Sequence, residues 1–141
     1  SPEGIARIRP GGNLRGPASA LGTFYEDLLS PESSRLLKAE TIRQFTGRVR
    51  VDLFDETFKH VMDWGLGFMP DNKRHGPAPY GFGAHCSERT FGHGGAQSSA
   101  AFADPDVGLA AVIMFNGMPG ELRHQRRIRK TCEAIYEDLK L

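Results

Sequence analysis

The segment from Phe91 to Ala96 combines residue types that could do chemistry. It reads Phe-Gly-His-Gly-Gly-Ala, so glycines flank His93 on both sides. On an extended strand, missing side chains leave backbone N–H groups open to a ligand, and such groups can stabilise an oxyanion. The same pattern is also typical of a bulged strand that carries a structural histidine. The residue types by themselves leave both interpretations open.

Motifs that define common active sites are absent from the 141 residues. No phosphate-binding Gly-x-x-x-x-Gly-Lys-[Ser/Thr] occurs, and the Gly-x-Gly pairs at 65–67 and 81–83 lack the third glycine of a dinucleotide site. The sequence also contains no His-Glu-x-x-His, Gly-x-Ser-x-Gly, Ser-x-x-Lys or Tyr-x-Asn. We therefore expect no cofactor, and no motif provides a nucleophile with its base.

The histidines and cysteines form no recognisable metal site. His75, His85, Cys86 and His93 are of types that bind zinc, but their spacing fits no compact ligand pattern. Cys86 beside His85 is a poor nucleophile pair, because adjacent residues rarely orient for proton transfer. We expect no metal, and the first three residues are interpreted as loop residues near the mouth of a cleft. Two cysteines make no disulfide framework, so a reducing compartment such as the cytoplasm is the default expectation.

The composition is that of an ordinary globular domain. Lys and Arg number 18 against 17 Asp and Glu, so a net charge of +1 does not indicate a nucleic-acid partner. No apolar run approaches the roughly 18 residues that a membrane-spanning helix needs. A basic cluster near the C-terminus is interpreted as the solvated face of a helix, and it comprises Arg123, Arg126, Arg127, Arg129 and Lys130.

Hydrophobic periodicity and turn residues predict the order of the elements. Helices are expected at 17–29 and from Ser30 to Gly47, and 48–62 is ambiguous. A strand at 64–69 and a long loop at 70–90 should follow. The rest of the chain is expected to form strands at 90–96, 98–103 and 109–115 and an amphipathic helix at 120–139. The link Asp104-Pro105-Asp106-Val107-Gly108 predicts an antiparallel hairpin between the last two strands.

These elements predict an α+β fold, in which an antiparallel sheet of three to four strands packs against a C-terminal helix and follows an N-terminal helical segment. We divide the chain into a loop or linker at 1–16, a helical segment at 17–62, and the sheet plus C-terminal helix at 63–141, as one partial domain. A single covering helix leaves a sheet edge and a face unprotected. The first two helices have no obvious place on that sheet.

Several segments together resemble the C-terminal part of the serine β-lactamase-like family, which includes class C β-lactamases, related esterases and penicillin-binding-protein-like hydrolases. The segments are Trp64-Gly-Leu-Gly-Phe, Phe91-Gly-His-Gly-Gly-Ala, Ala101-Phe-Ala-Asp-Pro-Asp-x-Gly-Leu-Ala and Phe115-Asn-Gly-Met, and the stretch at 11–29 is also similar. Their order and spacing carry the resemblance, which extends from about Gly11 to Leu139. It implies the C-terminal part of the β-lactamase/transpeptidase-like fold.

The resemblance also implies roles for individual residues. His93, Gly94 and Gly95 would be the family's active-site strand triad, with His93 assisting substrate binding and the Ala96 N–H donating to the oxyanion. Two residues of the preceding loop, Tyr80 and His85, would contact substrate. A histidine in place of lysine favours ester hydrolysis over amide or β-lactam hydrolysis.

The family's serine and tyrosine motifs lie earlier in its chain, and neither is present here. Acyl transfer needs an activated nucleophile, so we expect this chain to be inactive alone. A start at Ser1 without Met is expected of a portion of a longer protein. The expected partners are a small-molecule ester or amide substrate in the parent protein, and the missing N-terminal part of the domain or a homodimer partner. The alternative is a non-catalytic binding or interaction module on the same scaffold.

Overall fold

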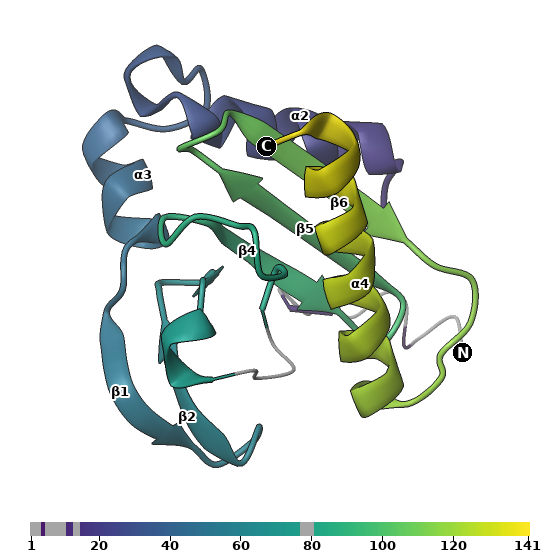
Figure 1. Cartoon of the computed structure of the whole chain (residues 1–141). Helices are drawn as coiled ribbons and strands as arrows, with labels where there is room; N and C mark the ends of the chain where they lie inside the picture. Colours follow the sequence, from purple (N-terminus) through teal and green to yellow (C-terminus); the bar gives the residue numbers. More distant parts are fainter. Residues whose placement is uncertain (1–3, 5–10, 13–14, 77–80) are drawn as a thin grey trace.

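The computed structural model describes residues 4, 11–12, 15–76 and 81–141 (Figure 1). Their elements, in chain order, are α2 (Ala18–Leu29), the 3-10 helix η1 (Pro31–Ser33), α3 (Ala39–Thr46), β1 (Arg50–Asp55), β2 (His60–Trp64), β3 (Met69–Pro70), the 3-10 helix η2 (Lys73–His75), β4 (Phe91–Gly95), β5 (Ser99–Asp104), β6 (Leu109–Met114) and α4 (Glu121–Leu139). Most of the loop or linker predicted at 1–16 lies outside the described residues.

The main sheet is antiparallel and four-stranded, in the order β3-β4-β5-β6. β4 pairs with β5 along its whole length, from Phe91 opposite Ala103 to Gly95 opposite Ser99. β5 and β6 form the predicted hairpin, whose turn is closed by Gly108 with a φ of +66°. A backbone with this φ favours glycine, so Gly108 is the residue that lets the predicted turn form. The predicted α+β class is confirmed.

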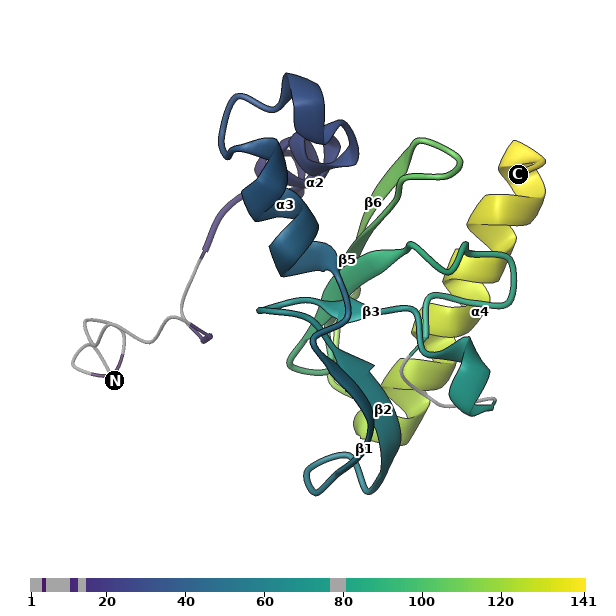
Figure 2. The ribbon, with the colours of Figure 1, turned by 90° about the vertical axis from the view of Figure 1, so that its left-hand side faces the viewer.

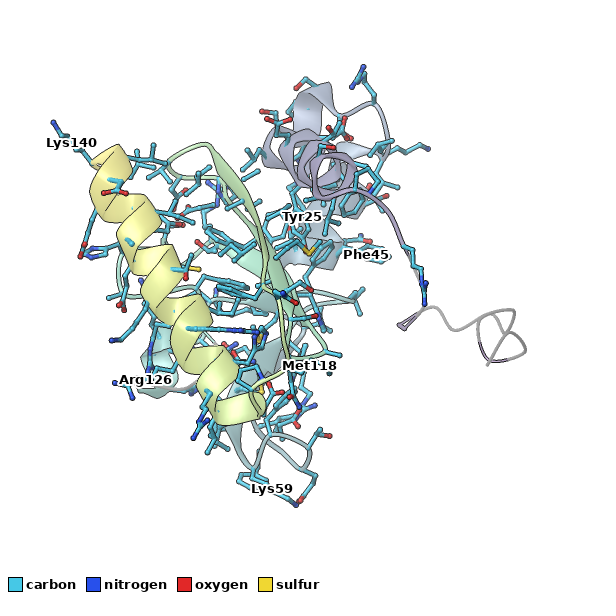
Figure 3. All side chains as sticks on the ribbon, turned by 90° about the vertical axis from the view of Figure 1, so that its right-hand side faces the viewer. Tyr25, Phe45, Lys59, Met118, Arg126 and Lys140 are labelled. Carbon is cyan, nitrogen blue, oxygen red and sulfur yellow. The ribbon has the colours of Figure 1, made fainter. Side chains whose placement is uncertain are left out.

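Helices cover both faces of this sheet (Figure 2). Ala100 and Phe102 of β5 belong to the core under α4, whereas Ala101 and Ala103 belong to the core under α2. Figure 3 shows Tyr25 directed from α2 onto the sheet, on the side opposite to α4. The expectation of an unprotected face is therefore wrong, because α2 buries its apolar stripe against that face.

The hairpin β1–β2 corrects the assignment of 17–62 as a helical segment. β1 pairs antiparallel with β2, with a register shift between Arg50 and Leu53. Alternating residues in this stretch suit a strand, but the shift breaks the strict alternation. Asp52 at the shift and Lys59 at the turn have φ values of +56° and +61°. Neither is glycine, so the sequence gives no local signal for these backbone conformations.

Two further elements differ from the prediction. The helix expected from Ser30 to Gly47 is interrupted, because the Ser34 hydroxyl accepts hydrogen bonds from the N–H groups of Leu36 and Leu37, both at 3.2 Å. Such local side-chain bonds compete with helical ones. The strand expected at 64–69 is divided between β2 and β3 by a turn, in which the Gly65 N–H donates to the Phe68 carbonyl at 2.8 Å.

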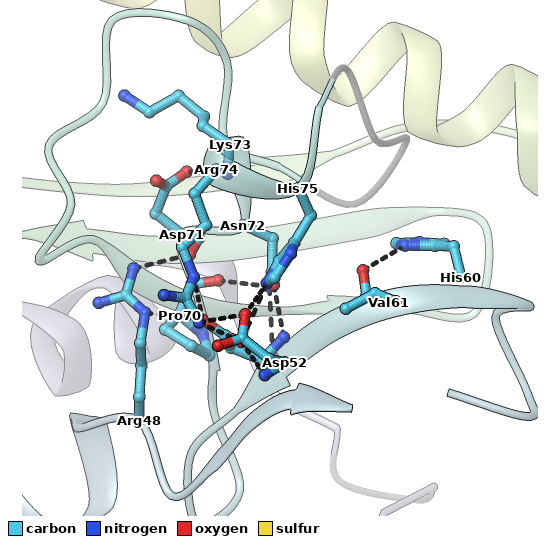
Figure 4. Close-up of polar contacts among 11 residues, drawn as sticks. Arg48, Asp52, His60, Val61, Pro70, Asp71, Asn72, Lys73, Arg74 and His75 are labelled. Carbon is cyan, nitrogen blue, oxygen red and sulfur yellow. Dashed lines mark hydrogen bonds and ion pairs between the residues drawn. The ribbon is translucent and has the colours of Figure 1, made fainter. Parts of the chain in front are cut away.

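A buried carboxylate joins the β1–β2 hairpin to η2. Asp63 of β2 is fully buried and forms 3.0 Å contacts to Nε of Arg48, Nε of Arg74 and Nε2 of His75 (Figure 4). It also accepts a hydrogen bond from the Asp52 N–H at 3.0 Å. Burial opposes ionisation, but Arg74, the Asp52 N–H and His75 outweigh it and hold the pKa of Asp63 well below its usual range.

Replacing Asp63 by Asn should lower the free energy of unfolding by about 3 kcal/mol at neutral pH, because two arginines lose a buried anionic partner. Urea denaturation measures the change. The matched control is Glu56→Gln, which removes an exposed 3.0 Å ion pair with Lys59 and should leave stability unchanged.

The effect of Asp63→Asn should depend on pH. A pKa lowered by folding stabilises the protein above the unfolded-state value of about 4 and ceases to do so as the pH falls further. The difference between Asp63→Asn and the unmodified chain should therefore be full at pH 7 and shrink below about pH 4. A variant as stable as the unmodified chain at pH 7 would contradict the assignment.

Candidate active site

The segment His93–Ala96 lies at an open edge of the main sheet. The short strand β3 pairs only with Phe91 and Gly92 of β4. Beyond that point β4 continues to Gly95 with β5 as its one neighbouring strand among the described residues. The backbone of the predicted site is therefore accessible from the side that β3 leaves uncovered.

β4 contains three glycines, and the space around the backbone differs from one position to the next. A Cβ on Gly92 would lie 2.2 Å from the Ala101 carbonyl oxygen, and one on Gly95 would lie 2.2 Å from Oγ of Ser99. A Cβ on Gly94 would meet nothing nearer than the Ser99 carbonyl oxygen at 4.0 Å. Packing against the backbone of β5 requires glycine at position 92, whereas a Cβ at position 95 would meet only a hydroxyl that can rotate away. At Gly94 the missing side chain instead leaves space beside the strand.

His93 is exposed, and its ring orientation is set by its neighbours. Nδ1 lies 2.7 Å from the Gly94 carbonyl oxygen. Because a carbonyl can only accept, Nδ1 carries the proton in the neutral ring, and Nε2 holds a lone pair. The ring also lies 5.8 Å from that of Trp64. On the other face, the buried Tyr25 hydroxyl accepts a hydrogen bond from the His93 backbone N–H. Burial raises the pKa of Tyr25, so this hydroxyl remains uncharged.

A cavity of about 200 Å³ adjoins this segment. It is lined by the predicted residues His93, Gly94, Gly95 and Ala96, together with Phe58, Trp64, Met69, Gly81, Phe82, Gln97, Ala100, Glu121, His124, Gln125 and Ile128. The Ala96 N–H has no hydrogen-bond partner within the described part of the chain. The fold thus gathers four predicted residues on one cavity and leaves a backbone donor at its wall.

The first turns of α4 supply cavity residues that sequence reasoning missed. His124 is buried, and its Nδ1 accepts a hydrogen bond from Nε of Arg127 at 3.3 Å. Burial and the Arg127 charge lower the pKa of His124, so this imidazole is neutral. Glu121 accepts a 2.7 Å hydrogen bond from the Gln125 side chain. Their positions in the sequence are about 30 residues from β4, and no local pattern links the two segments.

His85, the other predicted site residue that the structure describes, does not line the cavity. Tyr80 lies outside the described residues. His85 is exposed, with Nε2 3.7 Å from Oε1 of Glu137 and its ring 6.5 Å from that of Tyr136. It therefore lies against the C-terminal half of α4. Cys86 and Cys132 are free and buried, and burial raises the pKa of each to about 12. Both remain protonated thiols at neutral pH and are not activated nucleophiles.

One group of three potential metal ligands occurs among residues 15–76 and 81–141, namely Asp52, Asp63 and His75. The Asp63 carboxylate is already paired with Arg48 and Arg74. A cation would have to displace these guanidinium groups, so the geometry is that of a structural ion-pair network. None of its members lines the cavity next to His93.

These features define an α+β domain with a cavity at the edge of an antiparallel sheet, and solved hydrolases share this fold. A β-lactamase from Mycobacterium bovis superposes with a TM-score of 0.73 at 24% identity, over 99% of this chain and 53% of that protein. EstA from Arthrobacter nitroguajacolicus Rue61a gives a TM-score of 0.51 at 26% identity, over 85% of this chain and 33% of EstA. The chain thus spans about half or less of the length of these structures.

The chain belongs to the Beta-lactamase family, whose model matches residues 1–134. The family match and the two structural neighbours confirm the resemblance drawn from the sequence. A comparison with curated proteins finds no match. Among the described helices, none has the length and apolar character needed to cross a membrane.

A matched pair of alanine variants tests whether the space beside Gly92 and Gly94 differs as the structure indicates. Gly92→Ala should lower the free energy of unfolding by about 2 kcal/mol, since its Cβ collides with the backbone of β5. Gly94→Ala should unfold at nearly the same denaturant concentration as the unmodified chain, because its Cβ enters open space. Equal destabilisation of both variants in urea would contradict the cavity at Gly94.

Proposed function

We propose that this chain supplies the oxyanion-side wall of a serine hydrolase that cleaves small esters through an acyl-enzyme. The observation that carries the proposal is the gathering of His93, Gly94, Gly95 and Ala96 on one cavity, where the Ala96 N–H has no partner among the described residues. Membership of the Beta-lactamase family and the fold shared with a β-lactamase and with EstA support it.

The proposed chemistry assigns a separate task to each group. A serine hydroxyl attacks the ester carbonyl carbon, its proton passes to a base, and the carbonyl oxygen becomes an oxyanion. The Ala96 N–H donates to that oxygen, where a fixed backbone donor stabilises the developing charge. Collapse of the intermediate expels the alcohol and leaves an acyl-serine, which water then hydrolyses to the acid. Nε2 of His93, which holds the lone pair, accepts a hydrogen bond at the substrate side of the cavity.

The nucleophile and its base belong to a part of the enzyme outside these 141 residues. Ser-x-x-Lys and Tyr-x-Asn are absent from the sequence. The chain covers 53% of the β-lactamase and 33% of EstA to which it is similar, which leaves room for a catalytic portion elsewhere. Without an activated nucleophile, the wall and half of an oxyanion hole do not support turnover.

A second candidate is a non-catalytic binding module on the same scaffold. The observation that favours it is the lack of a nucleophile next to a preformed cavity. The two candidate functions predict different motifs in the reading frame that encodes the chain. The hydrolase requires Ser-x-x-Lys and Tyr-x-Asn upstream of Ser1, whereas the binding module does not.

Hydrolysis of 4-nitrophenyl butyrate tests the proposal directly. The 141-residue chain should release nitrophenol no faster than buffer does, because no group in it can form the acyl-enzyme. The product of the complete reading frame should hydrolyse the ester, and His93→Ala in it should lower kcat/KM by about 100-fold.

The control is His85→Ala, which changes an exposed histidine away from the cavity and should leave kcat/KM unchanged. Turnover by the 141 residues alone would overturn the claim that the nucleophile lies elsewhere. A complete reading frame with no serine motif and no activity would favour the binding module.

A further inference from the structure

One buried carboxylate orients two aromatic rings beside His93. Asp55, at the end of β1, is 6% exposed. Its Oδ2 accepts a hydrogen bond from the indole N–H of Trp64 at 3.0 Å. Its Oδ1 accepts from the backbone N–H groups of Thr57 and Phe58, at 2.9 and 3.0 Å. The same carboxylate therefore fixes the Trp64 ring and the turn that carries Phe58.

The two rings form one wall of the cavity. Trp64 and Phe58 are stacked, with ring centroids 5.8 Å apart and planes inclined by 29°. Both line the cavity, on which His93 and Ala96 also lie. Trp64 further contacts the His93 ring at 5.8 Å, so the aromatic wall directly adjoins the proposed oxyanion donor segment. A group bound against this wall lies next to the reacting carbonyl.

Cavity size and charge restrict what can bind. A dry apolar cavity of about 150 Å³ holds a benzene molecule. The cavity of about 200 Å³ is therefore large enough for one ring and a carbonyl group. Its lining is mainly apolar, and Glu121 is its one carboxylate among the described residues. Arg127 does not line the cavity, and its terminal nitrogen is engaged by the Gln97 and Gly117 carbonyl oxygens, to which it donates at 2.7 and 2.9 Å. An uncharged ligand is favoured over an anion.

We propose that Trp64 and Phe58, positioned by Asp55, form the acyl-binding wall of the site. This wall selects esters whose acyl group is compact, aromatic and uncharged, such as benzoyl esters. Trp64 and Phe58 are specificity-determining residues, and Asp55 is a positioning residue. The assignment of the wall to the acyl group depends on the proposed function. The binding of an aromatic ligand to the wall does not, since it requires no nucleophile.

Benzamide and benzoate test the wall on the chain as it exists. Both have one aromatic ring and a similar shape, but benzamide is neutral and benzoate is anionic. Proton–nitrogen correlation spectra report binding through the backbone N–H of Ala96 and the indole N–H of Trp64, which is the only tryptophan in the sequence. Benzamide should shift both resonances, with a Kd at least tenfold lower than that of benzoate.

Two matched pairs of variants separate the wall from the rest of the hairpin. Phe58→Ala should weaken benzamide binding about tenfold, whereas Phe54→Ala should not, because Phe54 is 51% exposed on the same hairpin and does not line the cavity. Phe58→Leu keeps apolar packing and should give the same direction of change if the alanine variant unfolds.

The second pair tests Asp55. Asp55→Asn places an amide donor where either the indole N–H or the backbone donors require an acceptor, so binding should weaken about fivefold and the indole resonance should move. Asp52→Asn makes the same chemical change at an exposed position and should leave binding and the indole resonance unchanged. Because a weakened hydrogen bond moves its proton upfield, the indole N–H proton of a folded Asp55→Asn variant should move upfield.

The inference is overturned if saturating benzamide leaves the Ala96 and Trp64 resonances unshifted, if benzoate binds as tightly, or if the Phe58 and Phe54 variants behave alike. These outcomes are independent of turnover. Ester hydrolysis by the complete reading frame without benzamide binding would sink this inference and leave the proposed function standing. Benzamide binding together with hydrolysis by the 141 residues alone would support the aromatic wall and overturn the claim that the nucleophile lies elsewhere.

Discussion

The burial of both faces of β5 is the constraint on which the rest of the structure depends. Ala101 and Ala103 face α2, while Ala100 and Phe102 face α4, and all four are at most 5% exposed. The small side chains of Ala101 and Ala103 let α2 approach this strand closely, and burial of apolar area on both faces stabilises all three layers at once. Because the position of α4 is fixed in this way, its first turns must form the floor of the cavity beside β4.

Buried carboxylates then determine how the irregular segments attach to these layers. Asp104 ends β5, is fully buried, and accepts hydrogen bonds from Tyr136 and Ser87 hydroxyls, both at 2.6 Å. Asp63 and Asp55 act similarly at η2 and at the hairpin turn. A buried carboxylate is costly unless its oxygens are paired, so each of these residues strongly favours one arrangement of its neighbours. The long segment between β3 and β4 is thereby held against the sheet without regular structure of its own.

The sequence predicted those parts of the fold that depend on local chemistry. The β5–β6 hairpin follows from alternation and a Pro-Asp-Val-Gly turn, and α4 follows from helical periodicity. The β1–β2 hairpin was not predicted, because its register shift and the positive φ values at Asp52 and Lys59 have no glycine to announce them. The place of α2 was also missed, since periodicity shows that a helix has an apolar stripe but not which surface covers it.

The same distinction applies to the candidate site. His93 to Ala96 stood out because glycines around a histidine are a local pattern. Phe58, Trp64 and His124 reach the cavity from other elements, and their residue types are equally common in an ordinary core. The apolar character of Trp64 gave no sign that Asp55 fixes its ring, since that contact joins two strands across a hairpin that was itself not predicted.

The two edges of the sheet are open for different physical reasons. At β4, the brevity of β3 and the free space at Gly94 expose backbone donors beside a cavity, and the surrounding packing holds them in place without any ligand. Such preorganisation costs stability but no reorganisation when charge develops. At the opposite edge, β6 consists of Leu-Ala-Ala-Val-Ile-Met, with no charged residue, and Met114 is 54% exposed. Proteins ordinarily protect such an edge with charges, proline or a further strand, because an uncharged apolar edge readily pairs with another chain. The first edge thus presents a backbone donor to a cavity, whereas the second has the apolar, uncharged composition of a strand that pairs with a further strand.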